Sequence, residues 1–561
     1  MICGALAVRA GAQTLPSSSK PRDSSAIYYT LIGELALARQ EPRVAALAYV
    51  SAATADPGLW PRATGVAVEA LQPTVALDAA EHWIAQDPNA LEPHLDLAYA
   101  ALSLYQVAVA ADAYRFVIAH YEGGVEAAFA AVEPQLLAAE NPYAARQVAD
   151  RLDGYFPVSA AAKRLQGFAA LQASDPAAAA RAFRAAIALE SATPNAPGSQ
   201  RRRRALVDAL RRARVLSGDV DVPLAEAAAA LRRQPTAGNR YDYGILLLAA
   251  RKSAAARSQM VRLLRDRRYG PDATRIVALL DFQSGHDEAA RQRYGELLAG
   301  GHYVDEAYYY LGLIADRRHD EIGALRDLAR VRHGDEVLPA MLRAASILRK
   351  RGAGSTADEL LDELLEDEPQ RAPQIFAVRA QIDARAGETQ RALALISHAV
   401  REYPDDPDLA YALASIEEQA GRTDAALATL RAALARRPDD PEALNAYGYT
   451  LADHGRQLDE ARRLIERALG FAPRDAAIRD SLAWALYRQG RTAAALPIES
   501  AAYRDAPGGD IGAHLGEILW QLGQRDRAQR IWANAAEIDP EDRLLQQTRA
   551  RLTAAAPPAV R

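Results

Sequence analysis

The amino-acid sequence predicts an all-α chain built from repeated antiparallel helix pairs, and three observations support this fold class. Half of the 561 residues are hydrophobic but only 6% are aromatic, and the abundant alanine favours thin, closely packed helices over strands. Glycine and alanine recur at fixed offsets within a repeating unit. Prolines recur every 33 to 35 residues in the C-terminal third, at Pro369, Pro404, Pro438, Pro473, Pro507 and Pro540.

The marker residues of each unit predict two helices joined by a tight turn. Glycine ends the first helix because it adopts a left-handed conformation at little cost. Small residues lie where the two helices touch, and proline ends the second helix because it lacks an amide donor. The unit 441–473 carries one extra residue near Arg456, where a turn tolerates an insertion. The unit ending at Pro438 shows the markers Ala414, Gly421, Ala426 and Ala433, and the unit ending at Pro540 shows Gly516, Gly523, Ala528 and Ala535.

The same offsets return near the N-terminus and, less regularly, in the middle of the chain. Gly33, Ala45, Ala52 and Pro57 mark the first unit. About fifteen units of about 34 residues fit between Ala26 and Pro540, of which roughly eleven are well marked. Three further units in the middle of the chain begin their markers at Gly167, Gly244 and Gly312.

Breaks in this pattern predict the domain organisation. Residues 1–25 are expected to be the remnant of a signal peptide plus a linker, and 26–190 an N-terminal array. The Pro- and Gly-containing stretch 191–203 predicts a loop or hinge, 204–553 form the C-terminal array, and 554–561 are expected to be a disordered tail.

The N-terminal residues predict export from the cytoplasm, with an incidental apolar start as the alternative. Residues 2–8 are apolar, and Ala10-Gly11-Ala12 resembles a cleavage site, although no basic segment precedes them. Cys3 follows only Met1 and Ile2, so no lipobox supports a lipid anchor. No later stretch has the length of apolar sequence that a membrane helix needs.

The composition and motifs argue against catalysis, a cofactor or nucleic acid. A net charge of −5 supplies no general basic field for nucleic acid. One cysteine permits no multi-cysteine metal cage, and the ten histidines lack the i, i+4 spacing of a helical zinc site. Nucleotide-binding and hydrolase motifs are absent from the sequence. We therefore expect no metal, no cofactor and no enzyme activity, with an enzyme containing a cryptic site as the weakest alternative.

The period and the small–small–proline pattern resemble the tetratricopeptide repeat family. The resemblance implies a right-handed α-solenoid whose first helices line a concave groove that binds peptide segments. Aromatic, Asn and Arg side chains there would supply anchors and hydrogen bonds, with packing between helices as the alternative role. The residues at these groove positions are Tyr309, Tyr411, Asn445, Tyr449, Asp480, Trp484, Tyr487, Arg488, Glu517 and Trp520, with Tyr241 at an equivalent position farther up the chain.

Each of two charge clusters has a structural and a functional interpretation. The basic region comprises Arg201 to Arg204, Arg211, Arg212, Arg214, Arg232 and Arg233. It predicts a solvated helix face, or else a dock for an acidic partner. The acidic run 358–368 leaves Leu360, Leu361, Leu364 and Leu365 for the core, which favours an ordinary amphipathic helix.

Residues 27–36, 480–487 and 514–520 resemble a more particular group of proteobacterial envelope proteins. The resemblance implies an outer-membrane-attached or periplasmic adaptor that binds and activates a carboxyl-terminal processing protease and delivers substrates such as cell-wall hydrolases. The missing lipobox departs from the group. A cytoplasmic scaffold for a macromolecular assembly is the alternative function.

Overall fold

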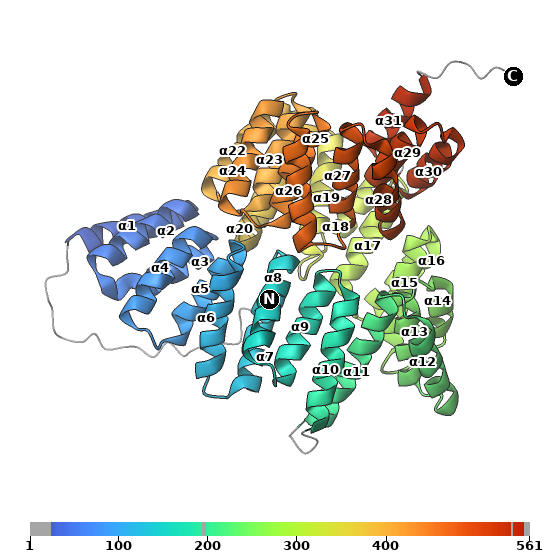
Figure 1. Cartoon of the computed structure of the whole chain (residues 1–561), viewed down its shortest axis with the longest axis horizontal. Coiled ribbons are helices and arrows are strands. Elements are labelled where there is room, and N and C mark those ends of the chain that lie inside the picture. Colours follow the sequence, from blue (N-terminus) through green and yellow to red (C-terminus); the bar gives the residue numbers. More distant parts are fainter. Residues whose placement is uncertain (1–23, 193–197, 540–541, 555–561) are drawn as a thin grey trace. The chain divides into compact units, whose positions relative to one another are not determined.

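The computed structural model describes residues 24–192, 198–539 and 542–554, and these contain 31 α-helices, two short 3-10 helices and no strand (Figure 1). Most helices that follow one another in the chain also pack against one another. The predicted fold class is confirmed. No helix in the described part of the chain is both long enough and apolar enough to cross a membrane.

Two compact units group the helices. Among the described residues, unit 1 comprises those up to 96, 156–168 and 176–404, and unit 2 comprises 97–155, 169–175 and those from 405 onward. Helices α5 (Leu91–Ser103) and α9 (Ala160–Gln172) contribute residues to both.

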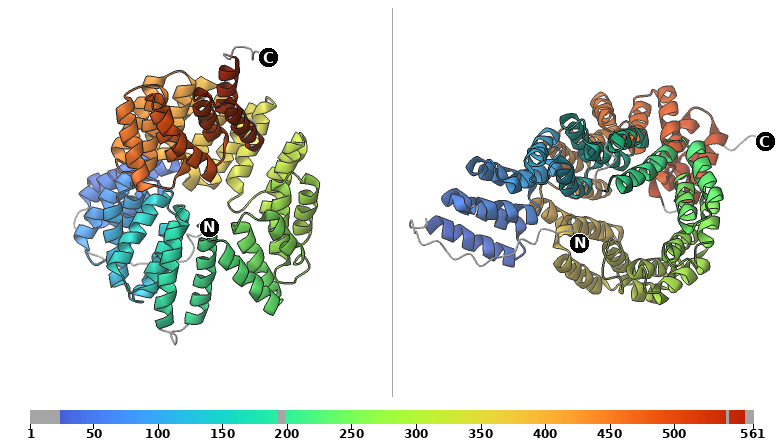
Figure 2. Two further views of the ribbon diagram at one scale, coloured as in Figure 1. Left: turned by 45° about the vertical axis from the view of Figure 1, so that its right-hand side comes forward. Right: turned by 90° about the horizontal axis from the view of Figure 1, so that it is seen from below.

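Unit 1 contains α1 (Ser24–Ala38), α2 (Pro42–Ala55), η1 (Pro57–Leu59), α3 (Trp60–Glu69), α4 (Pro73–Gln86), α10 (Pro176–Ala192), α11 (Ser199–Leu216), α12 (Asp221–Arg233), α13 (Ala237–Ala249), α14 (Ser253–Val261), α15 (Gly270–Gln283), α16 (Asp287–Ala299), α17 (Val304–Arg317), α18 (Glu321–Leu328), α19 (Val337–Lys350), α20 (Gly354–Asp367), η2 (Pro369–Arg371), α21 (Ala372–Arg385) and α22 (Thr389–Glu402). The side-by-side stacking of its helices is visible in Figure 2.

Unit 2 contains α6 (Val107–His120), α7 (Val125–Leu137), α8 (Pro142–Tyr155), α23 (Pro407–Gln419), α24 (Thr423–Arg436), α25 (Pro441–Asp453), α26 (Leu458–Phe471), α27 (Ala476–Arg488), α28 (Thr492–Asp505), α29 (Gly509–Gln521), α30 (Arg525–Ile538) and α31 (Arg543–Ala554).

Proline and glycine delimit the helices as the sequence predicts. In four successive repeats, proline stands two residues after the end of the second helix, at Pro404, Pro438, Pro473 and Pro507. Gly421 and Gly490 follow first helices with φ angles of 73° and 78°, in the left-handed region that side chains with a Cβ avoid. Pro540 lies outside the described residues.

In six of the described helix pairs, a glycine on the first helix faces a large residue on the second helix. A Cβ built at Gly33 would lie 2.7 Å from the Tyr49 ring, and one at Gly312 would lie 2.7 Å from Leu328 Cγ. The partner follows 16 residues after the glycine, or 17 residues in the pair Gly448–Ile465, which spans the inserted residue near Arg456. The other pairs with the 16-residue spacing are Gly167–Phe183, Gly244–Met260 and Gly516–Trp532.

The predicted interruption 191–203 needs a correction at its C-terminal side. Helix α10 continues to Ala192 and α11 begins at Ser199, so residues 199–203 are helical and do not form a loop. The carboxylate of buried Glu190 explains this start, because Arg202 Nε lies 2.6 Å from its Oε1. The Ser199 hydroxyl also donates to the Glu190 carbonyl at 3.3 Å.

Three predictions concern residues that the structure does not describe. Residues 193–197 of the predicted hinge, the predicted signal-peptide remnant up to residue 23, and residues 555–561 of the predicted tail lie outside the described ranges.

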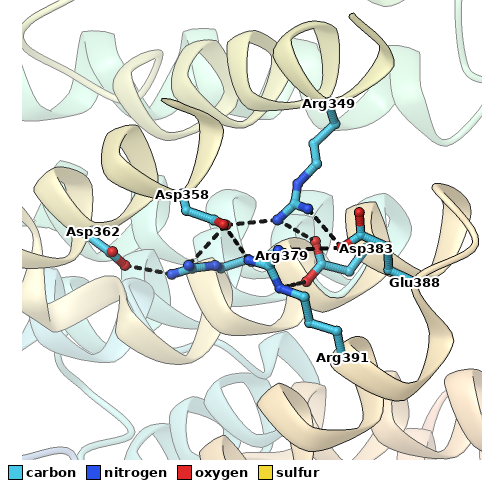
Figure 3. Close-up of polar contacts among 7 residues, drawn as sticks. All are labelled: Arg349, Asp358, Asp362, Arg379, Asp383, Glu388 and Arg391. Atoms are coloured by element: carbon cyan, nitrogen blue, oxygen red, sulfur yellow. Dashed lines mark hydrogen bonds and ion pairs between the residues drawn. The ribbon is translucent and has the colours of Figure 1, made fainter. Parts of the chain in front are cut away.

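A buried ion-pair network joins four helices of unit 1, α19 to α22 (Figure 3). Its central side chains are Arg349, 4% exposed, and Asp383, 0% exposed. One guanidinium nitrogen of Arg349 lies 2.7 Å from Asp358 Oδ1 and 2.8 Å from Asp383 Oδ1. Burial raises the pKa of Asp358, but its arginine partners outweigh burial and the net pKa is lowered. The outer members are Asp362, Arg379, Glu388 and Arg391.

We expect Gly312→Ala to lower the free energy of unfolding by about 1–3 kcal/mol, because the added methyl group overlaps Leu328. Urea unfolding followed by circular dichroism measures the change. Gly295→Ala is the matched control, since a Cβ there meets no atom within 4 Å, and it should stabilise the chain by up to about 1 kcal/mol. Equal effects of the two variants would show that the small-against-large contact does not matter.

We expect Arg349→Ala to destabilise the chain by about 3–5 kcal/mol, because it removes the buried guanidinium shared by Asp358 and Asp383 and leaves buried Asp383 with only the more exposed Arg391, whose Nε lies 3.3 Å from its Oδ2. The matched control is Arg351→Ala, which removes an exposed arginine of the same unit whose Nη1 lies 3.2 Å from Glu321 Oε2. It should lower the free energy of unfolding by at most about 1 kcal/mol. The measurement is the urea midpoint of both variants. Similar midpoints would contradict the structural importance of the network.

Candidate protein-binding site

Four polar residues recur at one position on the first helices of the last four repeats. We call Tyr411, Asn445, Asp480 and His514 the polar column; they lie on α23, α25, α27 and α29, and are 34, 35 and 34 residues apart. The Tyr411 hydroxyl and the Asn445 Oδ1 are buried without a hydrogen-bond partner. Asp480 and His514, by contrast, contact each other, with His514 Nδ1 2.8 Å from Asp480 Oδ1.

An aromatic cluster covers the Asp480–His514 end of the column. The Trp484 ring stacks on His514 with centroids 4.1 Å apart and lies 5.1 Å from the Tyr487 ring, while Tyr449 lies 6.0 Å from His514. Trp484 Nε1 donates to Asp453 Oδ1 at 3.0 Å. Trp484 is only 6% exposed, so its ring mainly packs the repeats together.

Tyr487, Arg488 and Glu517 extend this cluster toward the surface. Glu517 is buried and accepts hydrogen bonds from the Tyr487 hydroxyl at 3.1 Å and from Arg551 Nη2 at 2.5 Å. Burial, followed by the Glu517 charge, raises the pKa of Tyr487 to about 12. The Arg488 guanidinium lies 5.7 Å from the Trp484 ring centre. Tyr487 and Arg488 remain partly exposed, so they are better placed than Trp484 to contact a partner.

The remaining predicted aromatic site residues each contact another aromatic ring of their own unit. Trp520 on α29 is partly buried, with its ring 5.5 Å from Trp532. In unit 1, half-buried Tyr309 contacts Tyr310 edge to face at 5.2 Å, and Tyr241 stacks on Tyr269 at 5.0 Å.

A cavity of about 310 Å³ lies among α11, α12 and α13 of unit 1. Arg211 and Arg212, from the basic region, line it together with Tyr241 and two carboxylates, Asp208 and Asp242. Arg211 Nη1 lies 3.2 Å from Asp208 Oδ1, and burial raises the pKa of Asp242. The basic region therefore contributes both to a helix surface and to this mixed-charge cavity.

The acidic run is confirmed as an amphipathic helix. On α20, Leu361 and Leu364 are buried in the core while Leu360 and Leu365 pack against it. Asp358 and Asp362 bind Arg379, and Asp358 also binds Arg391.

Glu499 is a charged residue at a core position. It is the eighth residue of α28, and the eighth residue of the four other second helices in this region is a large apolar side chain. These counterparts are Ile396, Leu430, Ile465 and Trp532, all at most 4% exposed. Glu499 is 0% exposed, and among the described residues no N–H or hydroxyl group donates to its carboxylate oxygens; when protonated, its carboxyl group can donate a hydrogen bond to Asp480.

Asp480, Glu499 and His514 form a buried cluster of three potential metal ligands. One ligand atom from each residue lies within 4.8 Å of the other two. Burial, then the charge of Asp480, raises the pKa of Glu499 well above its ordinary value. Burial by itself lowers the pKa of His514, but Asp480 outweighs it and the net pKa is raised. The cluster can therefore hold a proton or a cation between its carboxyl groups.

Sequence reasoning identified Asp480 but missed Glu499 and His514. The signal for His514 was its spacing of 34 residues from Asp480 in the polar column. The signal for Glu499 was its position in the repeat, because the second helices of neighbouring repeats carry a large apolar residue there. The i, i+4 criterion for metal ligands failed to find the cluster because its three residues come from three different helices.

A second polar assembly in unit 2, which we call the N-cap seam, joins the start of α8 to the starts of α25 and α27. Asp440 caps α25 through the Glu442 amide at 3.0 Å and also accepts from Asn141 Nδ2 at 3.2 Å. Asp475 caps α27 and accepts from the Tyr143 hydroxyl at 2.6 Å. Helix caps of successive repeats therefore also hold a distant part of the same unit.

Asp406 is the corresponding cap of α23 and accepts from the Leu409 amide at 2.9 Å. Burial raises its pKa to about 7, opposed by the Leu409 hydrogen bond and assisted by the charge of Glu140. A carboxyl whose pKa is raised on folding stabilises the fold below its unfolded pKa and loses that contribution as the pH rises through its folded value.

We expect Asp406→Asn to gain stability relative to the wild type as the pH rises, by about 2–3 kcal/mol between pH 5 and pH 8. Asparagine keeps the capping oxygen but does not ionise. Urea unfolding at several pH values measures the difference. The control Asp439→Asn changes an exposed carboxylate in the next repeat. Its plot of stability against pH should run parallel to that of the wild type. A parallel curve for Asp406→Asn would disprove the raised pKa.

Comparison with known proteins identifies the repeats. Tetratricopeptide-repeat family models match residues 384–448 and 448–510, so this part of the chain consists of tetratricopeptide repeats. The TPR repeat-containing protein PA4667 of Pseudomonas aeruginosa is 30% identical over 255 residues, which are 46% of this chain and 43% of the relative. The chain thus matches less than half the length of that relative.

Two solved structures show weak similarity to this chain. A tetratricopeptide repeat protein from Parabacteroides merdae has 17% identity and a TM-score of 0.33, covering 45% of this chain and 99% of its own. Yeast Tom70 has 13% identity and a TM-score of 0.30, and the match covers 95% of this chain and 96% of the Tom70 chain. Tetratricopeptide repeats indicate a scaffold for protein–protein interactions.

Proposed function

We propose that the chain is a non-enzymatic adaptor that binds one protein along the first helices of its C-terminal repeats and a second protein near its N-terminal helices. Holding the two together would raise their effective concentration for each other. The observation that carries this proposal is the row of aromatic and polar side chains on α23, α25, α27 and α29.

This row has the chemistry of a peptide-binding surface. Tyr487 and Arg488 offer a partly exposed ring and a guanidinium side by side, the residue types that most often dominate protein interfaces. Farther along, the Tyr411 hydroxyl and the Asn445 Oδ1 have no hydrogen-bond partner among the residues that the structure describes. Main-chain amides and carbonyls of an extended peptide are suitable partners for such groups once side chains move aside.

The first helix pair offers a second surface of a different kind. On α1, Ile27, Tyr28 and Leu31 are 58%, 59% and 67% exposed, and Leu47 on α2 is 47% exposed. An apolar patch at this position supports the binding of another protein there.

Our proposal for the partner is a carboxyl-terminal processing protease, with cell-wall hydrolases as the delivered substrates, in the periplasm or at the outer membrane. Its support is the resemblance of residues 27–36, 480–487 and 514–520 to envelope adaptors. These stretches fall on α1, α27 and α29, the helices that carry the two surfaces above. The apolar residues 2–8 and the Ala10-Gly11-Ala12 sequence support export.

We expect the double variant Tyr487→Ala, Arg488→Ala to weaken binding of a substrate hydrolase by about 2 kcal/mol, or roughly 30-fold in Kd. The experiment uses the purified full-length chain, the processing protease of the same organism and a cell-wall hydrolase. Calorimetry measures each binary affinity, and the cleavage rate is measured with and without the chain.

The matched control is Arg463→Ala, Glu466→Ala, which changes two exposed residues of the second helix α26. It should bind and stimulate cleavage as the wild type does. Ile27→Asp with Leu31→Asp should instead weaken binding of the protease. Absence of any complex between the wild-type chain and the protease would reject this partner. Crosslinked purification of the tagged chain from its native cells, followed by mass spectrometry, tests the compartment.

A further inference from the structure

We propose that Asp480, Glu499 and His514 form a binding site for one divalent transition-metal ion, Zn²⁺, inside the repeat stack. The site would join three consecutive helices, α27, α28 and α29. This inference does not depend on the adaptor function, because it rests on the buried cluster alone.

The arrangement of the three side chains fits a metal site. Their ligand atoms lie within 4.8 Å of one another. Zinc bonds to nitrogen and oxygen of about 2.0–2.2 Å place tetrahedral ligand atoms roughly 3.3 Å apart. Side-chain movements on the order of an ångström therefore bring the three atoms around one ion. The 2.8 Å contact between His514 Nδ1 and Asp480 Oδ1 already holds two of them together.

The polar atoms of the cluster lack partners that a cation would supply. Glu499 is fully buried, and among the described residues no N–H or hydroxyl group donates a hydrogen bond to either of its carboxylate oxygens. Buried polar groups without partners are costly and uncommon in proteins. Two carboxylates around a divalent ion also form a locally neutral group, which a buried site requires.

The position of Glu499 makes a purely structural role harder to explain. Isoleucine, leucine and tryptophan fill the equivalent core position in neighbouring repeats. A carboxylate there loses apolar packing and adds desolvation. Metal coordination provides a compensating interaction that this repeat alone would have.

The donor set selects the class of ion. One imidazole and two carboxylates suit zinc, whereas magnesium and calcium prefer sites made of oxygen ligands alone. The stacked Trp484 ring and the nearby Tyr449 ring restrict the orientation of His514. Three protein ligands leave a fourth position for water or for a group from a bound partner.

The experiment is a calorimetric titration of the EDTA-treated, full-length chain with ZnCl₂ in competition with a chelator, together with thermal unfolding. We expect one tightly bound equivalent and a higher Tm with zinc, and no Tm shift with MgCl₂. Glu499→Gln and His514→Gln should each weaken zinc binding at least about tenfold.

Glu499→Ile distinguishes loss of the metal site from loss of the fold, because it restores the residue type of the neighbouring repeats. It should remain folded, lose the tight equivalent and lose the zinc-dependent rise in Tm. His454→Gln is the matched control. His454 is exposed, and its Nε2 lies 3.0 Å from Glu418 Oε1; this variant should bind zinc as the wild type does.

Two outcomes would overturn the proposal. One is equal zinc affinity of the wild type and Glu499→Ile, which would place the ion elsewhere. The other is a wild type that binds no zinc while Glu499→Ile raises the Tm, which would mean that Asp480 and Glu499 share a proton.

Discussion

The close contact between the two helices of each repeat is the constraint on which the rest of the structure depends. A glycine on the first helix admits the ring or branched side chain that follows 16 or 17 residues later, as in Gly33–Tyr49 and Gly448–Ile465. In these pairs the glycine sets how near the two axes approach, because a Cβ at that position would overlap the partner side chain. The packing of the two helices in turn determines where the other residues of the repeat lie.

Much of the fold could be predicted because its determinants are local and periodic. Proline, glycine and alanine act through backbone geometry and size, so their spacing alone indicates helix ends and helix contacts. The start of α11 could not be predicted from the residue types in 191–203. It depends on the ion pair between Glu190 and Arg202, and the composition of a segment does not reveal such a pair.

The candidate site could be predicted from the sequence less completely than the fold. The repeat frame placed Asp480, Trp484 and Tyr487 on one helix face, and the structure brings these residues together with His514. The frame did not show that Trp484 would be covered, because burial depends on the side chains of the next repeat. Glu499 was missed for a related reason, since a lone carboxylate in sequence reveals nothing of the groups that helices on either side bring against it.

The N-cap seam has a consequence for how the chain folds. In an ordinary solenoid, repeats touch only their neighbours, so terminal repeats fray and partly folded states are populated. The bonds from Asn141 to Asp440 and from Tyr143 to Asp475 join residues 299 and 332 positions apart. They raise the contact order of unit 2 and cost loop-closure entropy before they form. Once made, they couple early and late repeats into a single cooperative transition.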